Sequence, residues 1–141
     1  MTDDACQAIR SARAAINDAI ARRDPEAIAP FLLSSYHVVT ARSMQRNGQA
    51  DSVRSWAILF DRDSSATHHG TPDEIHINEE WGMAEEHGRW TGSLMANDGP
   101  IEITGTYAAK WHYTAEGWLL QAEIFTPLTI TRGDATDRTL E

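Results

Sequence analysis

Cysteine, basic residues and long apolar runs are scarce in this sequence. Cys6 is the one cysteine among 141 residues, so neither an internal disulfide nor a zinc-type cysteine spacing is available. Twelve Lys and Arg against 21 Asp and Glu give a net charge of −9, which excludes attraction to nucleic acid or to an anionic membrane surface. No apolar stretch approaches the ~20 residues that span a bilayer, and the N-terminus lacks the features of a secretion signal. We therefore expect a soluble, cytoplasmic protein, and nothing in the pattern implies a metal or a cofactor.

What the sequence does contain is a helical half followed by a strand half. We expect one domain over residues 1–132 and a polar tail over residues 133–141. Apolar residues recur at helical spacing near the start, at Ala5, Ile9, Ala12, Ile16 and Ile20. Asp24-Pro25 predicts the start of a second, short helix that ends at Pro30. A strand over Tyr36–Thr40 follows, and a third helix presents Trp56 and Phe60 on one face.

From Thr71 onward the hydrophobic period changes to two. Alternation predicts strands over residues 73–78, 83–95, 101–113 and 118–130. Asn97-Asp98-Gly99 predicts a hairpin, with Asp98 and Gly99 as its two-residue loop. Three helices followed by an antiparallel meander indicate the α+β class.

The two faces of these strands differ in composition. With Trp90 and Trp118 turned toward the core, the inner face consists of Ala84, Glu86, Gly88, Trp90, Gly105, Tyr107, Ala109, Trp111, Trp118, Leu120, Ala122, Ile124 and Thr126. The outer face consists of Glu85, His87, Arg89, Lys110, His112, Gln121 and Glu123. The inner face is rich in glycine and alanine, so it can curve strongly or leave space unfilled.

Glu86 is the one formal charge on the predicted inner face, and two interpretations of it stand. It lies in solvent or pairs with an arginine, or it faces a pocket whose apolar walls raise its pKa toward the neutral range. In the second case Glu86 carries acid–base catalysis, and Tyr107 donates a hydrogen bond to the substrate or to Glu86.

The order of elements resembles the nuclear transport factor two-like superfamily, and within it the SnoaL-like domains of bacteria. The segments that carry the resemblance are Thr71–Ile75, Ala84–Trp90, Gly105–Tyr107, Lys110-Trp111, Gly117–Leu120 and Glu123–Phe125. The resemblance implies a cystatin-like cone in which helices and a curved sheet enclose a small apolar molecule. It also implies a homodimer formed through the outer face of the sheet. Ala122 and Ile124 depart from the pattern, because catalytic members often carry His or Asp on that strand.

We expect a small apolar molecule as the partner, bound in a pocket lined by Tyr36, Trp56, Phe60, Trp90 and Trp111. Glu86 and Tyr107 are the candidate catalytic residues, whereas His68 and His69 are expected in a solvated loop. Three functions fit this pattern. They are an isomerase, cyclase, dehydratase or hydrolase that uses acid–base chemistry, a binder of small molecules without chemistry, and a dimeric accessory domain with a filled cone.

The outer face of the sheet is predicted to form the dimer interface. Leu119 and Phe125, together with Met83 and Ala108, are expected to form an apolar island there.

Overall fold

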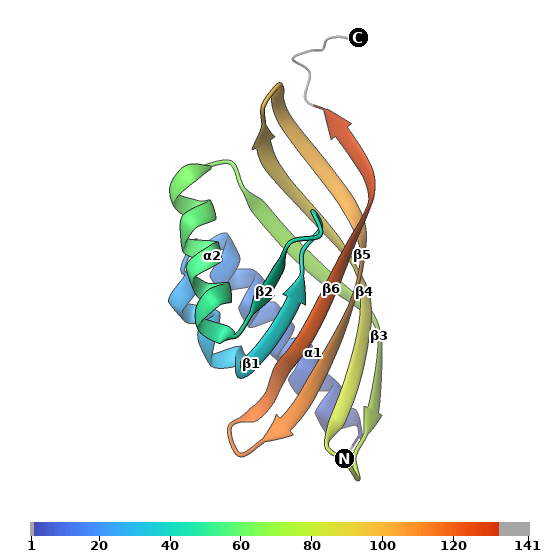
Figure 1. Ribbon diagram of the computed structural model, residues 1–141. Helices are drawn as coiled ribbons and strands as arrows, with labels where there is room; N and C mark the ends of the chain where they lie inside the picture. The colour runs from blue at the N-terminus through green and yellow to red at the C-terminus, as the bar shows by residue number, and fades with distance from the viewer. Residues whose placement is uncertain (1, 133–141) are drawn as a thin grey trace.

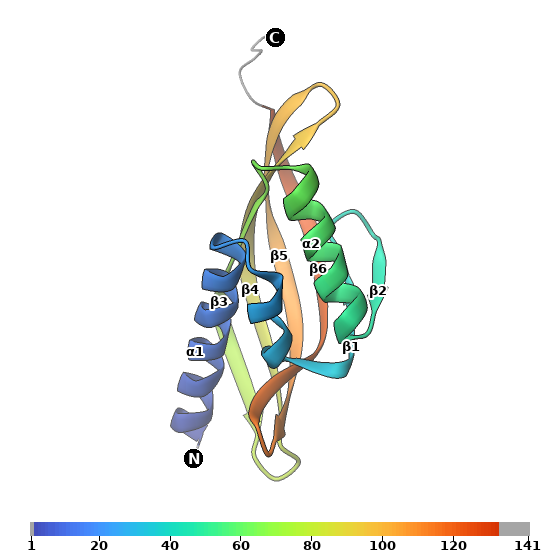
Figure 2. The ribbon, with the colours of Figure 1, turned by 90° about the vertical axis from the view of Figure 1, so that its left-hand side faces the viewer.

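Two α-helices cover one face of a long, twisted sheet within residues 2–132, which are the residues that the structure, a computed structural model, describes (Figure 1). The predicted tail over residues 133–141 lies outside them. The elements in chain order are α1 (Thr2–Ala21), 3₁₀ turns η1 (Pro25–Ala27) and η2 (Ala29–Phe31), β1 (Leu32–Val39), β2 (Gln45–Asn47), α2 (Gln49–Arg62), β3 (Thr67–Asn78), β4 (Met83–Ala96), β5 (Gly99–Thr114) and β6 (Gly117–Arg132). Figure 2 shows α1 and α2 in front of the sheet, with the turns η1 and η2 between them. No helix in the described part of the chain is long and apolar enough to cross a membrane.

The sheet confirms the predicted α+β class. Its strand order is β2-β1-β6-β5-β4-β3, and neighbouring strands are antiparallel except for β1 and β6, which run parallel. The short helix predicted after Asp24 is instead the pair of 3₁₀ turns η1 and η2. Pro25 and Pro30 explain this difference, because each removes a backbone donor that a continuous helix would need.

Helix α1 packs its predicted apolar stripe onto the inner face of the sheet. Ile9, Ile16 and Ile20 are each at most 4% exposed. Arg13 lies on the same stripe and is only 3% exposed, so the buried face of α1 also carries a charge. The helix period places Arg13 between Ile9 and Ile16, where its side chain must enter the interior.

The β4–β5 hairpin is shifted by two residues from the predicted register. Gly99 pairs with Ala96, so Asn97 and Asp98 form the loop, and Glu86 lies opposite Ala109 instead of Trp111. A shift of two residues keeps every side chain on its predicted face. Glu86 and Tyr107 therefore point inward as expected, at 0% and 3% exposure.

Strand β6 changes faces part-way along its length. Trp111 pairs with Leu120 but Lys110 pairs with Ala122, which leaves Gln121 as an extra residue. Such a bulge moves the side chains that follow it to the opposite face, up to a second irregularity at Leu128. The predicted faces of β6 are therefore wrong beyond Leu120, since Glu123 is buried and Ile124 is 53% exposed. The predicted outer island also loses Phe125, which packs against the core.

Glycines on the inner face give the large rings room. A Cβ at Gly88 would lie 2.3 Å from the carbonyl oxygen of Thr71 and 2.7 Å from the hydroxyl of Tyr107. At Gly70, on the neighbouring strand, the nearest atoms of Tyr107 would be 3.4 Å away. The phenol ring of Tyr107 thus lies over backbone at Gly88, where no side chain fits.

We expect Gly88→Ala to lower the free energy of unfolding by about 1–3 kcal/mol, because the new methyl group meets backbone that cannot yield. Gly70→Ala is the matched control. It adds the same atom beside the same ring at ordinary contact distance and should change stability by no more than about 0.5 kcal/mol. Urea titrations of both variants measure the difference. Equal stability of the two variants would contradict this account of Gly88.

Candidate functional site

Glu86 is the centre of a buried polar network. Its Oε1 accepts hydrogen bonds from Nη2 of Arg13 and Nε1 of Trp111, each at 2.8 Å. Its Oε2 accepts one from Nε of Arg13 at 3.0 Å and one from the hydroxyl of Tyr107. Four donors from three side chains therefore compensate the burial of one carboxylate.

A second carboxylate shares the same guanidinium. Nη2 of Arg13 lies 2.7 Å from Oε2 of Glu123, and the hydroxyl of Tyr36 donates to Oε1 of Glu123 at 2.6 Å. Arg13, Glu86 and Glu123 are all under 10% exposed and carry a formal charge of −1 together. We refer to these three residues with Tyr36, Tyr107 and Trp111 as the polar network.

The polar network keeps Glu86 ionised. Burial by itself raises the pKa of Glu86, but the charge of Arg13 and hydrogen bonds from Arg13, Tyr107 and Trp111 outweigh it, so the pKa lies below the ordinary 4.5. Burial also raises the pKa of Tyr107, which stays a neutral donor. Of the two interpretations of Glu86, the pairing with an arginine is the one that the structure shows, and the upward pKa shift that goes with an apolar pocket is wrong. The strand pattern shows the apolar walls around Glu86 but not the arginine that reaches it from α1.

Aromatic rings gather around His68 next to the polar network. The imidazole stacks on Trp90 with a centroid distance of 5.4 Å and meets the edges of Phe125 and Trp56 at 5.1 and 5.9 Å. Phe60 extends the group, 5.4 Å from Trp56. We call His68, Trp56, Phe60, Trp90 and Phe125 the aromatic cage. Its rings come from α2, β3, β4 and β6, so helix and sheet each supply a wall.

His68 has the one titratable side chain of the aromatic cage, and it is neutral. Burial, assisted by the positive charges of Arg13 and His69, lowers the pKa of His68 to about 3. Among residues 2–132 no protein atom hydrogen-bonds to its ring, whose side chain is half-buried. A neutral imidazole has one nitrogen that donates and one that accepts. Both nitrogens therefore remain available to a bound molecule.

Tyr107 connects the cage to the network. Its ring stacks on Phe125 at 5.6 Å, and the guanidinium of Arg13 lies 4.9 Å above the centre of the same ring. The position of the cage wall on β6 thus depends on the charges beneath it.

Comparison with known proteins identifies the fold. No known protein family and no curated protein matches the sequence. A Novosphingobium aromaticivorans protein provisionally named scytalone dehydratase matches the structure with a TM-score of 0.81 at 14% identity, over 94% of this chain and 92% of its own. A nuclear transport factor 2-like superfamily protein of Salmonella enterica matches with a TM-score of 0.76 at 14% identity, over 92% and 94%. The chain has the nuclear transport factor 2-like fold.

Another solved structure with this fold is a type 2 hexachlorocyclohexane dehydrochlorinase. It matches with a TM-score of 0.74 at 13% identity, over 94% of this chain and 88% of its own. The nuclear transport factor 2-like fold thus includes proteins named for dehydration and for dehydrochlorination. The resemblance seen in the sequence is confirmed at the level of the fold, which is also called cystatin-like. The narrower SnoaL-like assignment stays a prediction.

The structure divides the predicted site residues between the two groups. Trp56, Phe60 and Trp90 lie in the aromatic cage. Tyr36 and Trp111 instead donate hydrogen bonds within the polar network. The two predicted catalytic residues, Glu86 and Tyr107, are in direct contact with each other.

Four residues of this region were missed by the sequence reasoning. Arg13 had a signal, because it falls on the apolar stripe of α1, but Glu123 and Phe125 had none, because the bulge at Gln121 has no sequence signature. His68 was expected in a loop, yet it lies on β3 opposite Gly92 of β4. No three His, Cys, Asp or Glu side chains of the described residues are placed to hold a metal ion.

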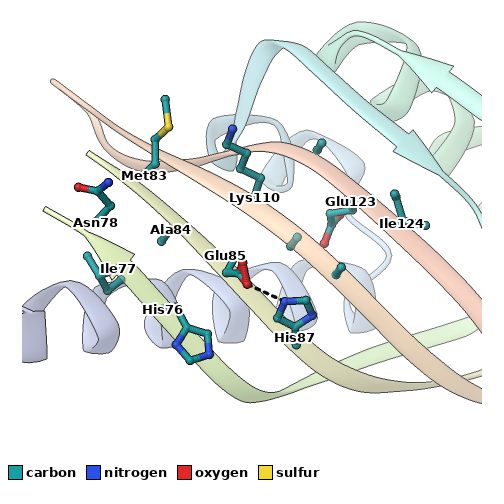
Figure 3. Close-up of a pocket in the computed structure, with 13 residues that line it drawn as sticks. His76, Ile77, Asn78, Met83, Ala84, Glu85, His87, Lys110, Glu123 and Ile124 are labelled. Carbon is teal, nitrogen blue, oxygen red and sulfur yellow. Dashed lines mark hydrogen bonds and ion pairs between the residues drawn. The ribbon is translucent and has the colours of Figure 1, made fainter. Parts of the chain in front are cut away.

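The outer face of the sheet carries a separate, open groove of about 570 Å³ (Figure 3). Met83, Lys110 and Ile124 line it together with two histidines, His76 and His87. Nε2 of His87 donates a hydrogen bond to Oε2 of Glu85, another lining residue, at 2.9 Å. The sheet separates this groove from the aromatic cage.

We expect Glu86→Gln to lower the free energy of unfolding at pH 7 by about 3 kcal/mol, because it places an amide NH₂ among donors and leaves buried partners unpaired. Because the pKa of Glu86 is lowered in the folded state, its stabilisation is present above the ordinary 4.5 and is lost as the pH falls through the folded-state value. The difference in the free energy of unfolding between Glu86→Gln and wild type should therefore become smaller as the pH is lowered into the acid range. Glu85→Gln, on the exposed side of the same strand, is the control and should differ little from wild type. A pH-independent loss in Glu86→Gln would contradict the assignment.

Proposed function

We propose that the chain binds a small, uncharged, hydrophobic ring compound in the aromatic cage and that His68 hydrogen-bonds a polar atom of it. The observation that carries this proposal is the half-buried, neutral imidazole, which contacts three aromatic rings while no protein atom among residues 2–132 bonds its nitrogens. Buried polar groups in proteins are almost always hydrogen-bonded, so an imidazole in such surroundings suits a ligand with a hydroxyl or carbonyl group.

The charges near the cage favour an uncharged ligand. The polar network beside it carries a formal charge of −1, and its guanidinium already contacts two carboxylates. An anionic ligand would lose hydration without gaining an unshared cation, and a cation would lie close to Arg13. Aromatic walls contribute binding energy through apolar area and ring stacking, which suits a planar compound.

Any proton transfer on the bound molecule falls to His68 under this proposal. Each oxygen of Glu86 already accepts two hydrogen bonds, and its lowered pKa leaves it without a proton to give. A neutral imidazole is the one acceptor left beside the ligand, but a pKa of about 3 makes it a weak base, so it suits hydrogen bonding better than proton abstraction. Structural neighbours named for dehydration and dehydrochlorination support elimination as the reaction class, with binding alone as the other reading of the same site.

We expect 2-naphthol to bind more tightly than naphthalene, because its hydroxyl can pair with the imidazole. His68→Phe should keep ring stacking but remove most of this preference, a change of about five- to tenfold in the ratio of dissociation constants. His69→Phe is the matched control and should leave the ratio unchanged. Tryptophan fluorescence titrations measure the six dissociation constants, two for each protein. Equal affinity of wild type for both compounds, or no saturable binding, would refute the proposed site.

We further propose that the outer groove is the interface of a homodimer. Ile124 is 53% exposed on the floor of this groove, beside Ala108 and Ala122, and Lys110 and Glu85 supply opposite charges at its margin. Apolar centres with charged rims are typical of such self-complementary interfaces.

We expect sedimentation of the wild type to give about twice the chain mass of 15.7 kDa at micromolar concentration. Ile124→Glu should give the monomer, because it places a charge at the centre of the interface. Ile130→Glu is the control, since Ile130 lies on the same strand at 55% exposure but away from the groove. A monomeric wild type would exclude the interface.

A further inference from the structure

Helix α2 forms one wall of the aromatic cage, yet it is weakly buried. Of its residues Gln49–Arg62, Ser52 is the buried one, and Ile58 is 47% exposed. Trp56 and Phe60, which form the wall, are half-buried. Apolar burial alone therefore does little to fix the position of this wall relative to His68.

A single guanidinium holds the C-terminal end of α2. Nη2 of Arg23 donates to the carbonyl oxygens of Phe60 at 2.9 Å and Asp63 at 2.7 Å, and Nη1 donates to that of Ala66 at 2.9 Å. The guanidinium carbon lies 4.6 Å from the ring centre of Phe60. A cation at this place also suits the negative end of the helix dipole.

The backbone of Arg23 has an unusual conformation. Its φ is +58°, in the left-handed region that glycine or asparagine adopts more readily. A long, branched donor therefore occupies a position where its backbone is disfavoured. The hydrogen bonds of Arg23 to three carbonyl groups stabilise the fold and offset the strain of its backbone.

The same contacts reach both sides of the aromatic cage. Phe60 belongs to the helix wall, whereas Ala66 precedes by two residues the imidazole of His68 on β3. We propose that Arg23 is the positioning residue of the ligand site, because it fixes the spacing between the α2 wall and His68; this inference rests on the function proposed above. Lysine cannot replace it, because a single ammonium lacks the planar fork that reaches three carbonyl groups.

The experiment compares Arg23→Lys and Arg23→Gly with wild type. Arg23→Gly removes the guanidinium and also relieves the backbone, so it separates the loss of the contacts from a general loss of stability. Arg22→Lys is the matched control, because the side chain of Arg22 is 54% exposed and its guanidinium bonds to the surface carboxylates of Asp18 and Asp24.

The first measurement needs no ligand. The charges that act on the His68 imidazole are those of Arg13 and His69, and neither is altered in these variants. In wild type and Arg22→Lys, His68 should stay neutral in NMR titrations down to about pH 4.5, because burial lowers its pKa to about 3. In both Arg23 variants we expect water to reach the ring and its pKa to rise, so that it titrates within this range.

The second measurement is the dissociation rate constant of 2-naphthol. We expect an increase of about tenfold in both Arg23 variants and none in Arg22→Lys, from the loss of charge-assisted hydrogen bonds that hold the wall. An unchanged His68 titration in both Arg23 variants overturns the proposal whether or not 2-naphthol binds. Failure of both variants to fold overturns it in favour of a purely structural role. Absence of naphthol binding to wild type, with the expected His68 titrations, refutes the proposed function and leaves the positioning role supported.

Discussion

The buried ion pair between Arg13 and Glu86 joins helix α1 to the inner face of the sheet. Without Glu86 the guanidinium of Arg13 would keep one of its two carboxylate partners, Glu123. Without Arg13 the two carboxylates would lie close together in the interior with no cation between them. Each removal leaves a buried charge uncompensated, which is far costlier than losing an exposed pair. Tyr107 is oriented by the same pair, and Phe125 stacks on Tyr107. The polar network thus determines the position of Phe125 in the aromatic cage.

Alternation of apolar and polar residues was enough to predict the α+β class and the faces of β4 and β5, whereas the cystatin-like cone came from the family resemblance. The hairpin register was wrong by two residues, but parity was retained, so Glu86, Tyr107 and Trp111 were correctly assigned to the interior. A pattern of period two carries information about faces and very little about register along the strand. The pattern therefore predicted correctly which residues share the inner face with Glu86, but not which residue of β5 lies directly opposite it.

The site was harder to predict because its parts come from departures from regular patterns. The bulge at Gln121 turns Glu123 and Phe125 inward, and a local extra residue is invisible to any count of alternation. Arg13 lies on the buried stripe of α1 by its spacing from Ile9 and Ile16, but an arginine by its residue type is expected in solvent. The position of His68 could not be predicted from its neighbours, because two adjacent histidines before a glycine are typical of a loop. In each case the missing information was tertiary, namely which element lies across from the residue.

The parallel pairing of β1 with β6 has a consequence for how the molecule assembles. Tyr36 and its partner Glu123 are 87 positions apart in the chain, and Arg13 and Glu86 are 73 apart. Contacts between such distant segments form only after a large loop has closed. Loop closure lowers the conformational entropy of the chain before the contact stabilises it, and this slows folding. During synthesis, Arg13 can pair with Glu86 once β4 has been made, but Tyr36 and Glu123 can meet only after β6 has been made, so this part of the polar network is completed late.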